Sequence, residues 1–255
     1  MSQANVPSSS SLPPGMQLRL AAVRALCFDL DGTLLDTIPD LATAANGMLV
    51  DLGLEPRPVA EVATYVGKGA DRLILRMLAA AGQPTEEGSD TFLQARKRFH
   101  VHYRHCNGKE ARLYPGVASG LKRMADIGLP MACVTNKPQE YIQPLLLHFH
   151  LRQYFDFFIG GDTLPTKKPD PGPLLEAAHR WYLAPGQVLM VGDSLNDAQA
   201  ARAARMPVVM LPYGYNEGRP LDSVDADATV EDLDQLATWL ELSRGLTPTA
   251  PSAKP

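Results

Sequence analysis

Short apolar segments alternate with amphipathic stretches along most of the chain. The apolar segments are short, partly β-branched or aromatic, and most end in Gly, Asp, Asn or Pro, which is typical of buried strands. They cover residues 22–28, 130–134, 155–159, 188–191 and 208–211. Between them, helical spacing of apolar residues covers 117–127, 139–149, 173–181 and 196–205. Since strands joined through helices run parallel and are covered on both faces, the pattern predicts an α/β fold with a doubly wound parallel sheet.

One long interval breaks this alternation. Residues 38–112 contain no convincing strand, and helical spacing is clearest over 41–52, 71–81 and 91–105. We therefore predict a helical cap at 38–112, inserted into a core made of 19–37 and 113–245. Thr37 is expected to cap the first helix of this insertion, with Pro39 and Asp40 in its first turn. The Ser- and Pro-rich ends, 1–18 and 246–255, are predicted to be flexible tails.

Composition narrows the classes of protein that fit. The 255 residues are 45% hydrophobic and 20% charged, with a net charge of −4, which excludes a disordered or collagen-like chain. The mild acidity argues against a partner that is a nucleic acid or an anionic membrane surface. No run approaches ~18 apolar residues, and no secretory signal opens the chain, so we expect no membrane span. Three widely spaced cysteines favour a reducing, cytoplasmic location.

The strongest chemical motif follows the first predicted strand, where Asp29 and Asp31 stand two residues apart, followed by Gly32 and Thr33. In an open parallel sheet, ligands bind beyond the carboxyl ends of the strands. Two carboxylates this close repel each other unless a cation joins them or one carries a proton. Either arrangement suits phosphate chemistry, in which one acid attacks phosphorus and the other transfers a proton. The alternative is a pair of loop aspartates that bond to their own backbone.

Three further motifs follow later strands. The segment 135–138, Thr-Asn-Lys-Pro, places a hydroxyl and an amide at a helix start, which suits a phosphoryl oxygen. Lys168 directly precedes Pro169, so its backbone is restricted and its ammonium can be aimed at an anion. Asp193 and Asp197 are oxygen ligands of the kind that suits Mg²⁺. Taken singly, each motif also fits a helix cap or a solvated loop.

Together the motifs favour one site. Each follows a predicted strand, and a parallel sheet gathers such positions at one edge. They would supply a nucleophile, a proton donor, phosphate ligands, a cation and carboxylates for a metal. No structural requirement of a sheet explains that set, so we predict metal-dependent phosphoryl transfer.

The four motifs, in order, resemble those of the haloacid dehalogenase superfamily. They are Asp29-x-Asp31-Gly-Thr, Thr135-Asn136, Lys168-Pro169 and Gly192-Asp193-Ser194-x-x-Asp197, and the resemblance spans residues 24–236. It implies a Rossmann-like core with an inserted α-helical cap. It further implies that Asp29 is the nucleophile that forms an aspartyl-phosphate and that Asp31 is the general acid and base.

The same resemblance implies roles for the other motif residues. Thr135 would bind the phosphate, and Lys168 would hold both the phosphate and Asp29. The Mg²⁺ ligands would be Asp29, Asp31 through its carbonyl, and Asp193, with Asp197 as a further ligand or a supporting carboxylate.

Narrower motifs resemble the bacterial phosphoglycolate phosphatases. They are Val66-Gly67-Lys68-Gly69-Ala70, Tyr114-Pro115-Gly116-Val117, Thr135-Asn136-Lys137-Pro138, Ile159-Gly160-Gly161-Asp162 and Tyr213-Gly214-Tyr215-Asn216. The substrate implied is 2-phosphoglycolate. In the cap, two glycines would let backbone N–H groups approach the anion while Lys68 adds a charge, although a Gly-rich turn before a helix is the alternative. The expected substrate-binding residues are Gly32, Thr33, Lys68, Gly69 and Asn136.

Several alternatives remain at this stage. Asp31 argues against a dehalogenase, which has no ester oxygen to protonate. A phosphatase for a sugar phosphate, a sugar-acid phosphate or pyrophosphate shares these motifs, as does a β-phosphoglucomutase-like phosphotransferase. A non-catalytic phosphate-binding module would be expected to have lost part of the motif set. The partner expected is a small phosphorylated metabolite, and the chain is expected to be a monomer or a homodimer.

Overall fold

The computed structural model describes residues 12, 15–216, 221 and 224–248, and its centre is a parallel sheet of six strands. In spatial order the strands are β5 (Phe157–Ile159), β4 (Met131–Val134), β1 (Ala25–Phe28), β6 (Val188–Gly192), β7 (Val208–Met210) and β8 (Ala228–Thr229). All neighbouring pairs are parallel. The predicted α/β fold with a Rossmann-like parallel sheet is therefore confirmed; β8 was not predicted, because two residues are too short to show a pattern.

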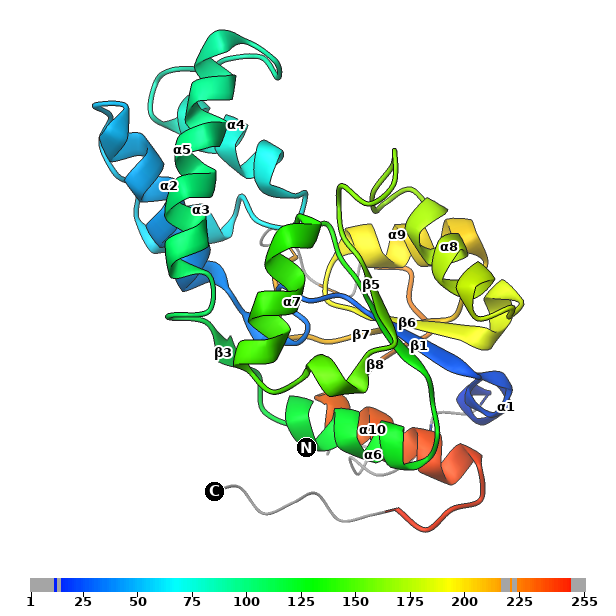
Figure 1. The fold of residues 1–255 in the computed structure, drawn as a ribbon. Coiled ribbons are helices and arrows are strands. Elements are labelled where there is room, and N and C mark those ends of the chain that lie inside the picture. Colours follow the sequence, from blue (N-terminus) through cyan, green and yellow to red (C-terminus); the bar gives the residue numbers. More distant parts are fainter. Residues whose placement is uncertain (1–11, 13–14, 217–220, 222–223, 249–255) are drawn as a thin grey trace, which may run out of the picture.

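Helices cover both faces of this sheet (Figure 1). One face packs against α1 (Met16–Ala22), α6 (Val117–Asp126), α7 (Gln139–His148) and α10 (Leu233–Ser243). The other packs against α8 (Gly172–Arg180) and α9 (Leu195–Ala204). Short 3-10 turns lie at Arg152–Tyr154 and Pro185–Gln187. The helices predicted between the strands are thus observed, with ends shifted by one residue.

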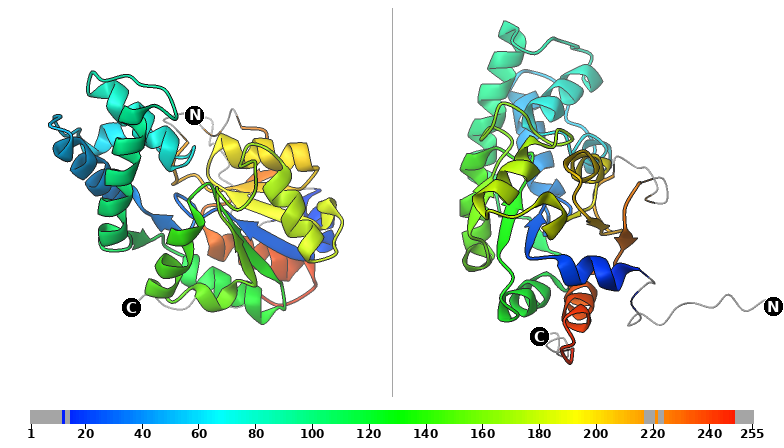
Figure 2. Two further views of the ribbon diagram at one scale, coloured as in Figure 1. Left: turned by 45° about the horizontal axis from the view of Figure 1, so that its top comes forward. Right: turned by 90° about the vertical axis from the view of Figure 1, so that its right-hand side faces the viewer.

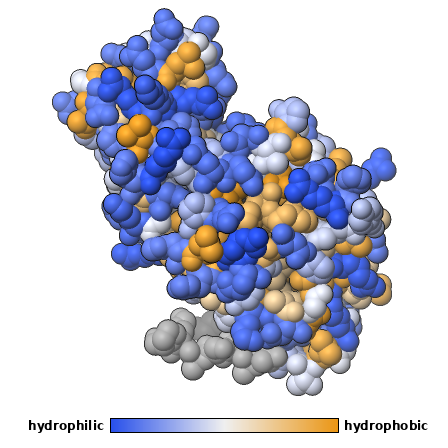
Figure 3. All heavy atoms as spheres, in the orientation of Figure 1, coloured by the Kyte–Doolittle hydropathy of each residue, from blue (hydrophilic) through white to orange (hydrophobic). Residues whose placement is uncertain are grey.

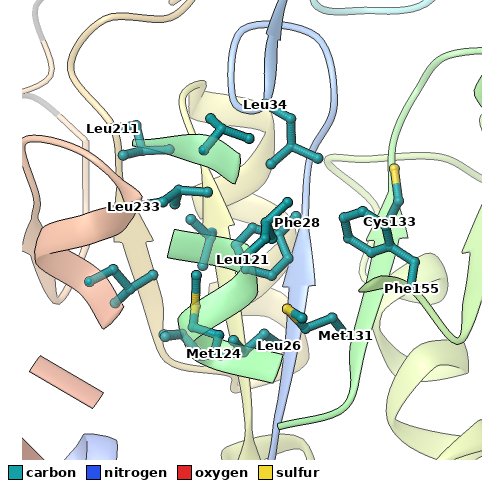
Figure 4. Packing of buried hydrophobic residues seen from close by; sticks show 14 of the residues in the cluster. Leu26, Phe28, Leu34, Leu121, Met124, Met131, Cys133, Phe155, Leu211 and Leu233 are labelled. Carbon is teal, nitrogen blue, oxygen red and sulfur yellow. The ribbon is translucent and has the colours of Figure 1, made fainter. Parts of the chain in front are cut away.

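Strand β1 shows how the two faces are built. Its side chains alternate, so Leu26 and Phe28 enter one hydrophobic cluster while Ala25 and Cys27 enter another, and all four are fully buried. In Figure 4, Leu26 and Phe28 lie among side chains of α6 and α10. A strand buried on both faces has little freedom to shift, so the residues that follow it are held in place.

The interval 38–112 forms four helices beyond the carboxyl ends of the strands (Figures 1 and 2). They are α2 (Ile38–Asp51), α3 (Val59–Ala63), α4 (Ala70–Ala80) and α5 (Asp90–Cys106). These helices share a hydrophobic cluster to which, among the described residues, Tyr141 and Tyr215 are the contributions from outside the interval. The chain enters them through β2 (Leu35–Asp36) and leaves through β3 (Arg112–Leu113), which pair antiparallel. We call this helical unit the cap and the rest the core.

The prediction of a flexible tail at 1–18 is wrong for residues 16–18. Helix α1 begins at Met16, and Met16 and Leu20 are buried because they lie four residues apart on one face that packs against α10. Residues 1–11 and 13–14, and 249–255 of the predicted C-terminal tail, lie outside the described residues.

The surface agrees with the absence of any membrane-spanning helix among the described residues. In the orientation of Figure 1, hydrophilic side chains cover most of the cap, and hydrophobic ones form separate small patches (Figure 3). Among the residues drawn in colour, this face of the cap therefore shows no broad hydrophobic area.

Candidate active site

Acidic side chains from two strand ends meet at the edge of the sheet. Asp29 follows β1, whereas Asp193 and Asp197 follow β6, and one carboxylate oxygen from each lies within 4.8 Å of the others. Strands β1 and β6 are neighbours in the sheet, which explains why residues 164 or more positions apart come together. Lys168 joins them, with its Nζ 3.0 Å from Asp29 Oδ1 and 2.6 Å from Asp197 Oδ1.

Asp29 is a buried carboxylate whose charge is only partly balanced. Burial raises its pKa to about 6, against the lowering effect of Lys168, while Asp197 and Asp31 raise it further. Its Oδ1 is buried and accepts no hydrogen bond among the described residues, although the Lys168 Nζ lies 3.0 Å away. An atom of this kind is well suited to a cation or to attack on an electrophile.

Asp193 is held from both sides by this chain's own donors. Its Oδ1 accepts a hydrogen bond of 2.6 Å from the Thr33 hydroxyl, and its Oδ2 accepts one of 2.5 Å from the Tyr215 N–H. Burial, followed by the charges of Asp197 and Asp29, raises its pKa well above the usual range. Gly32, with φ of 90°, approaches so closely that a Cβ there would lie 2.3 Å from Asp193 Oδ2. Because Gly32 has no Cβ, it leaves the space that the Asp193 carboxylate occupies.

The two carboxylate oxygens of Asp197 accept more hydrogen bonds than those of Asp193. Its Oδ2 accepts hydrogen bonds from the N–H groups of Asp193 and Ser194 and from the Ser194 hydroxyl, at 2.7–3.3 Å. Its Oδ1 accepts one from Lys168. Both oxygens are thus occupied within the protein, so Asp197 orients Lys168 and the loop that carries Asp193.

The site fits a divalent metal ion. Among the described residues, four carboxylates lie around it, those of Asp29, Asp31, Asp193 and Asp197, and three of these are paired with the ammonium groups of Lys137 and Lys168. Burial, and after it the charges of neighbouring carboxylates, raises the pKa values of Asp29 and Asp193. A hard cation bound by carboxylate oxygen would balance the charge of these carboxylates, and Asp29 and Asp193 have oxygen lone pairs left to bind one.

A cavity with about 470 Å³ of empty space, its mouth included, opens over Asp29 and Asp31 between the core and the cap. From the core, Thr135, Asn136 and Lys137 line it, and from the cap Gly67 and Gly69 do so. The Asn136 side chain donates to the Lys168 carbonyl at 2.8 Å and to the Gly67 carbonyl at 3.3 Å. It therefore connects the phosphate-site loop of the core to the glycine loop of the cap.

The other predicted substrate-binding residues are placed differently. Thr33 is fully buried and holds Asp193, and Gly32 packs against the same carboxylate, so neither lines the cavity. Lys68 lines a separate cavity of about 440 Å³ of empty space, together with Asn196 and Asn216. The Gly67 carbonyl accepts from the side-chain amides of Asn136 and Asn196, so at Gly67 the glycine loop turns an oxygen, not an N–H, toward the core.

Thr37 caps no helix with its side chain, contrary to expectation. It occupies the position before α2, but its hydroxyl donates to Asp31 Oδ1 at 2.7 Å. Its N–H donates to the Tyr215 hydroxyl at 2.7 Å. As expected, Pro39 and Asp40 lie in the first turn of α2, but the Asp40 carboxylate accepts from the N–H groups of Gly108 and Glu110, near the end of the cap sequence. Tertiary contacts have taken both side chains from the local roles that the sequence indicated.

Lys137 and Tyr103 are site residues that sequence reasoning missed. Lys137 Nζ lies 2.8 Å from Asp31 Oδ1 and donates to the hydroxyl of Tyr103, which reaches in from α5. The motif Thr-Asn-Lys-Pro contained Lys137, but a lysine next to a helix start is commonly solvent-exposed. Tyr103 lies in an amphipathic helix with nothing in its pattern to separate it from the cap's other aromatic residues.

Comparison with known proteins agrees with this geometry. A family model of the haloacid dehalogenase-like hydrolases matches residues 23–205. A phosphoglycolate phosphatase of Nitrosospira multiformis is 46% identical over 223 residues, covering 87% of this chain and 97% of that protein. One from Thiobacillus denitrificans is 44% identical, covering 84% and 94%.

A solved structure gives the same result for the fold. A crystal structure described as a predicted phosphoglycolate phosphatase of Haemophilus somnus 129PT has a TM-score of 0.79 and 34% identity, covering 88% of this chain and 97% of that one. The acid cluster, Lys168 and the parallel sheet agree with these matches. This chain belongs to the haloacid dehalogenase-like hydrolases.

Proposed function

We propose that this protein is a Mg²⁺-dependent phosphatase that hydrolyses 2-phosphoglycolate to glycolate and phosphate. The observation that carries the proposal is Asp29, a buried carboxylate that lines a cavity and whose Oδ1 lies 3.0 Å from Lys168 Nζ. The relatives named phosphoglycolate phosphatase, at 44–46% identity over nearly their whole length, support this substrate.

In the proposed reaction, a carboxylate oxygen of Asp29 attacks phosphorus and the bond from phosphorus to the ester oxygen breaks. Asp31 gives its proton to that oxygen, and glycolate leaves. Asp31 then takes a proton from water, which attacks phosphorus and releases phosphate and free Asp29. Lys168 and the Thr135 hydroxyl would balance the charge on the phosphoryl oxygens throughout.

The metal proposed is Mg²⁺, held by Asp29, Asp193 and the Asp31 carbonyl. Bound there, it would neutralise the acid cluster and draw charge from the phosphoryl group. Asp197 is proposed to support the site through Lys168 and Ser194 rather than to bind the metal, because its oxygens accept four hydrogen bonds from this chain, whereas those of Asp193 accept one each.

The cap at 38–112 is proposed to be a mobile lid on the core formed by 19–37 and 113–245. Gly67 of the cap and Asn136 of the core both line the cavity and are joined by a hydrogen bond, so opening of the cap would break this contact. The three cysteines are free and buried, which supports the cytoplasm as the proposed location.

The test is a panel of phosphomonoesters with Mg²⁺, ranked by kcat/KM, together with pyrophosphate and β-glucose 1-phosphate. We expect 2-phosphoglycolate to rank first. The matched control is Asp29→Asn, which keeps the side-chain volume and should lower kcat on every ester by about 10³-fold or more. A sugar phosphate at the top of the ranking would replace the proposed substrate, and near-normal turnover by Asp29→Asn would rule out the covalent route.

A further inference from the structure

We propose that Lys137 and Tyr103 form a subsite beside Asp31 that receives the carboxylate of the substrate. This inference rests on the proposed function, because it assigns the residues that would select a substrate with a second anionic group. Lys68, the cation expected for this role, lines a different cavity.

Lys137 is a buried cation with a donor to spare. Its side chain is 1% exposed, and its Nζ donates to Asp31 and to the Tyr103 hydroxyl. An ammonium has three N–H donors, and within the described residues the third has no acceptor. Lys137 is one of the residues that line the cavity, and the proposal assigns its third donor to a ligand bound there.

Tyr103 supplies the second donor. Its hydroxyl accepts from Lys137, and within the described part of the chain no acceptor is found for its own hydrogen. Burial, followed by the charge of Asp31, raises the pKa of Tyr103 well above its usual range, so the hydroxyl stays protonated. The ring is stacked on Phe99 and packed edge-on against Tyr141, which fixes its direction. Two adjacent donors, one of them charged, match the two oxygens of a carboxylate.

The other nearby cations are committed elsewhere. Lys168 is paired with Asp29 and Asp197 on the phosphate side. Arg96 and Arg104 are paired with Asp71 and Glu140 outside the cavity. Among the described residues that line the cavity, Lys137 is the only lysine or arginine.

The two donors come from different parts of the molecule. Lys137 follows a core strand, whereas Tyr103 lies on α5 of the cap, so the subsite is complete only when the cap is closed. A substrate carboxylate bound by both would therefore favour closure over the phosphate site, and an ester lacking that group would not.

The experiment compares kcat/KM for 2-phosphoglycolate and for 2-hydroxyethyl phosphate, an ester of similar size with a neutral hydroxyl in place of the carboxylate. Their ratio is measured in the wild type, in Lys137→Met and in Tyr103→Phe. We expect the preference for the carboxylate ester to fall about 10- to 100-fold in Lys137→Met, the size expected for a lost charged hydrogen bond, and less in Tyr103→Phe. Lys68→Met is the matched control and should keep the wild-type ratio.

The ratio of the two kcat/KM values distinguishes carboxylate binding by this subsite from a general role in catalysis or folding. Equal losses on both esters, or a loss of preference in Lys68→Met alone, would overturn the proposal. Should Lys137→Met fail to fold because Asp31 has lost its ion pair, Tyr103→Phe and Lys137→Arg test the same ratio. Tyr103→Phe at the wild-type ratio, with Lys137→Arg also unchanged, would overturn it too.

Failure of the proposed function gives a different result. If the wild type ranks another carboxylate-bearing ester such as 3-phosphoglycerate first, 2-phosphoglycolate is the wrong substrate. The subsite then stands if Lys137→Met removes that preference as well. If 2-phosphoglycolate ranks first and both variants keep the preference, the function stands and the subsite is wrong.

Discussion

The hydroxyl of Thr33 donates a 2.6 Å hydrogen bond to Asp193, 160 residues further along the chain. Both groups are buried, so the bond is shielded from water and holds one carboxylate oxygen in a fixed direction. The sequence placed Thr33 among the substrate ligands. Its observed partner makes it a support for the proposed metal site.

Replacing Thr33 by valine should therefore weaken metal binding more than substrate binding. Outer-shell partners of metal ligands contribute about 10- to 100-fold to metal affinity, and we expect a loss in that range for Thr33→Val. The measurement is the Mg²⁺ concentration for half-maximal activity, with KM for substrate determined at saturating Mg²⁺. Thr33→Ser keeps the hydroxyl and should retain Mg²⁺ affinity. If Thr33→Val instead raises KM and leaves the metal dependence unchanged, Thr33 belongs to the substrate site.

The acid cluster predicts an unusual dependence of stability on pH in the metal-free protein. The pKa of Asp29 is raised to about 6 when folded, whereas an unfolded aspartate titrates near 3.9. Between these values the folded state binds the proton more tightly, so stability is gained as pH falls from above 6 toward 4. The Asp29 contribution is roughly 3 kcal/mol at most.

We expect Tm in the presence of a chelator to rise as pH is lowered through this window. Asp29→Asn removes the titrating group, so its Tm should be higher than that of the wild type at pH 7 and should respond less to pH. Identical pH profiles for the two proteins would show that Asp29 does not carry this effect.

The parallel sheet was predictable because its strands are apolar on both faces, and four motifs follow strands that end at the same edge. What the sequence did not show are contacts that depend on the distance between separate elements. Thr37 has the sequence context of a helix cap, yet its hydroxyl bonds to Asp31. Lys137 looks solvent-exposed beside a helix start, but the cap covers it and supplies Tyr103. Local patterns contain no information about which side chain the cap will bring over the core.

Removal of metal should abolish activity, and added Mg²⁺ should restore it. Asp193→Asn should lose this response because it removes a carboxylate with free lone pairs while keeping its shape. Thermal unfolding provides a second measurement, since a ligand that binds only the folded state raises Tm. We expect Mg²⁺ to raise Tm in the wild type but not in Asp193→Asn. Full activity in chelator would contradict the proposed metal dependence.

The buried pair of Lys168 and Asp197 allows a double-mutant cycle. Their side chains are 2% and 0% exposed and lie 2.6 Å apart. Breaking such a pair leaves an uncompensated buried charge, which costs about 3–5 kcal/mol, whereas removing both charges costs less. We expect Lys168→Met to lower the free energy of unfolding by an amount in that range.

In the metal-free protein, the double variant Lys168→Met, Asp197→Asn should be more stable than the sum of the single effects predicts, by about 1–3 kcal/mol. Denaturant unfolding of the four proteins measures this coupling. If the effects of the two single substitutions on the free energy of unfolding simply add, Asp197 and Lys168 have no coupling energy. Activity should be lost in both variants that lack Lys168, because the repaired double variant regains stability but not the ammonium beside Asp29. Stability and catalysis thus separate within one cycle, which assigns Asp197 to positioning and Lys168 to the reaction.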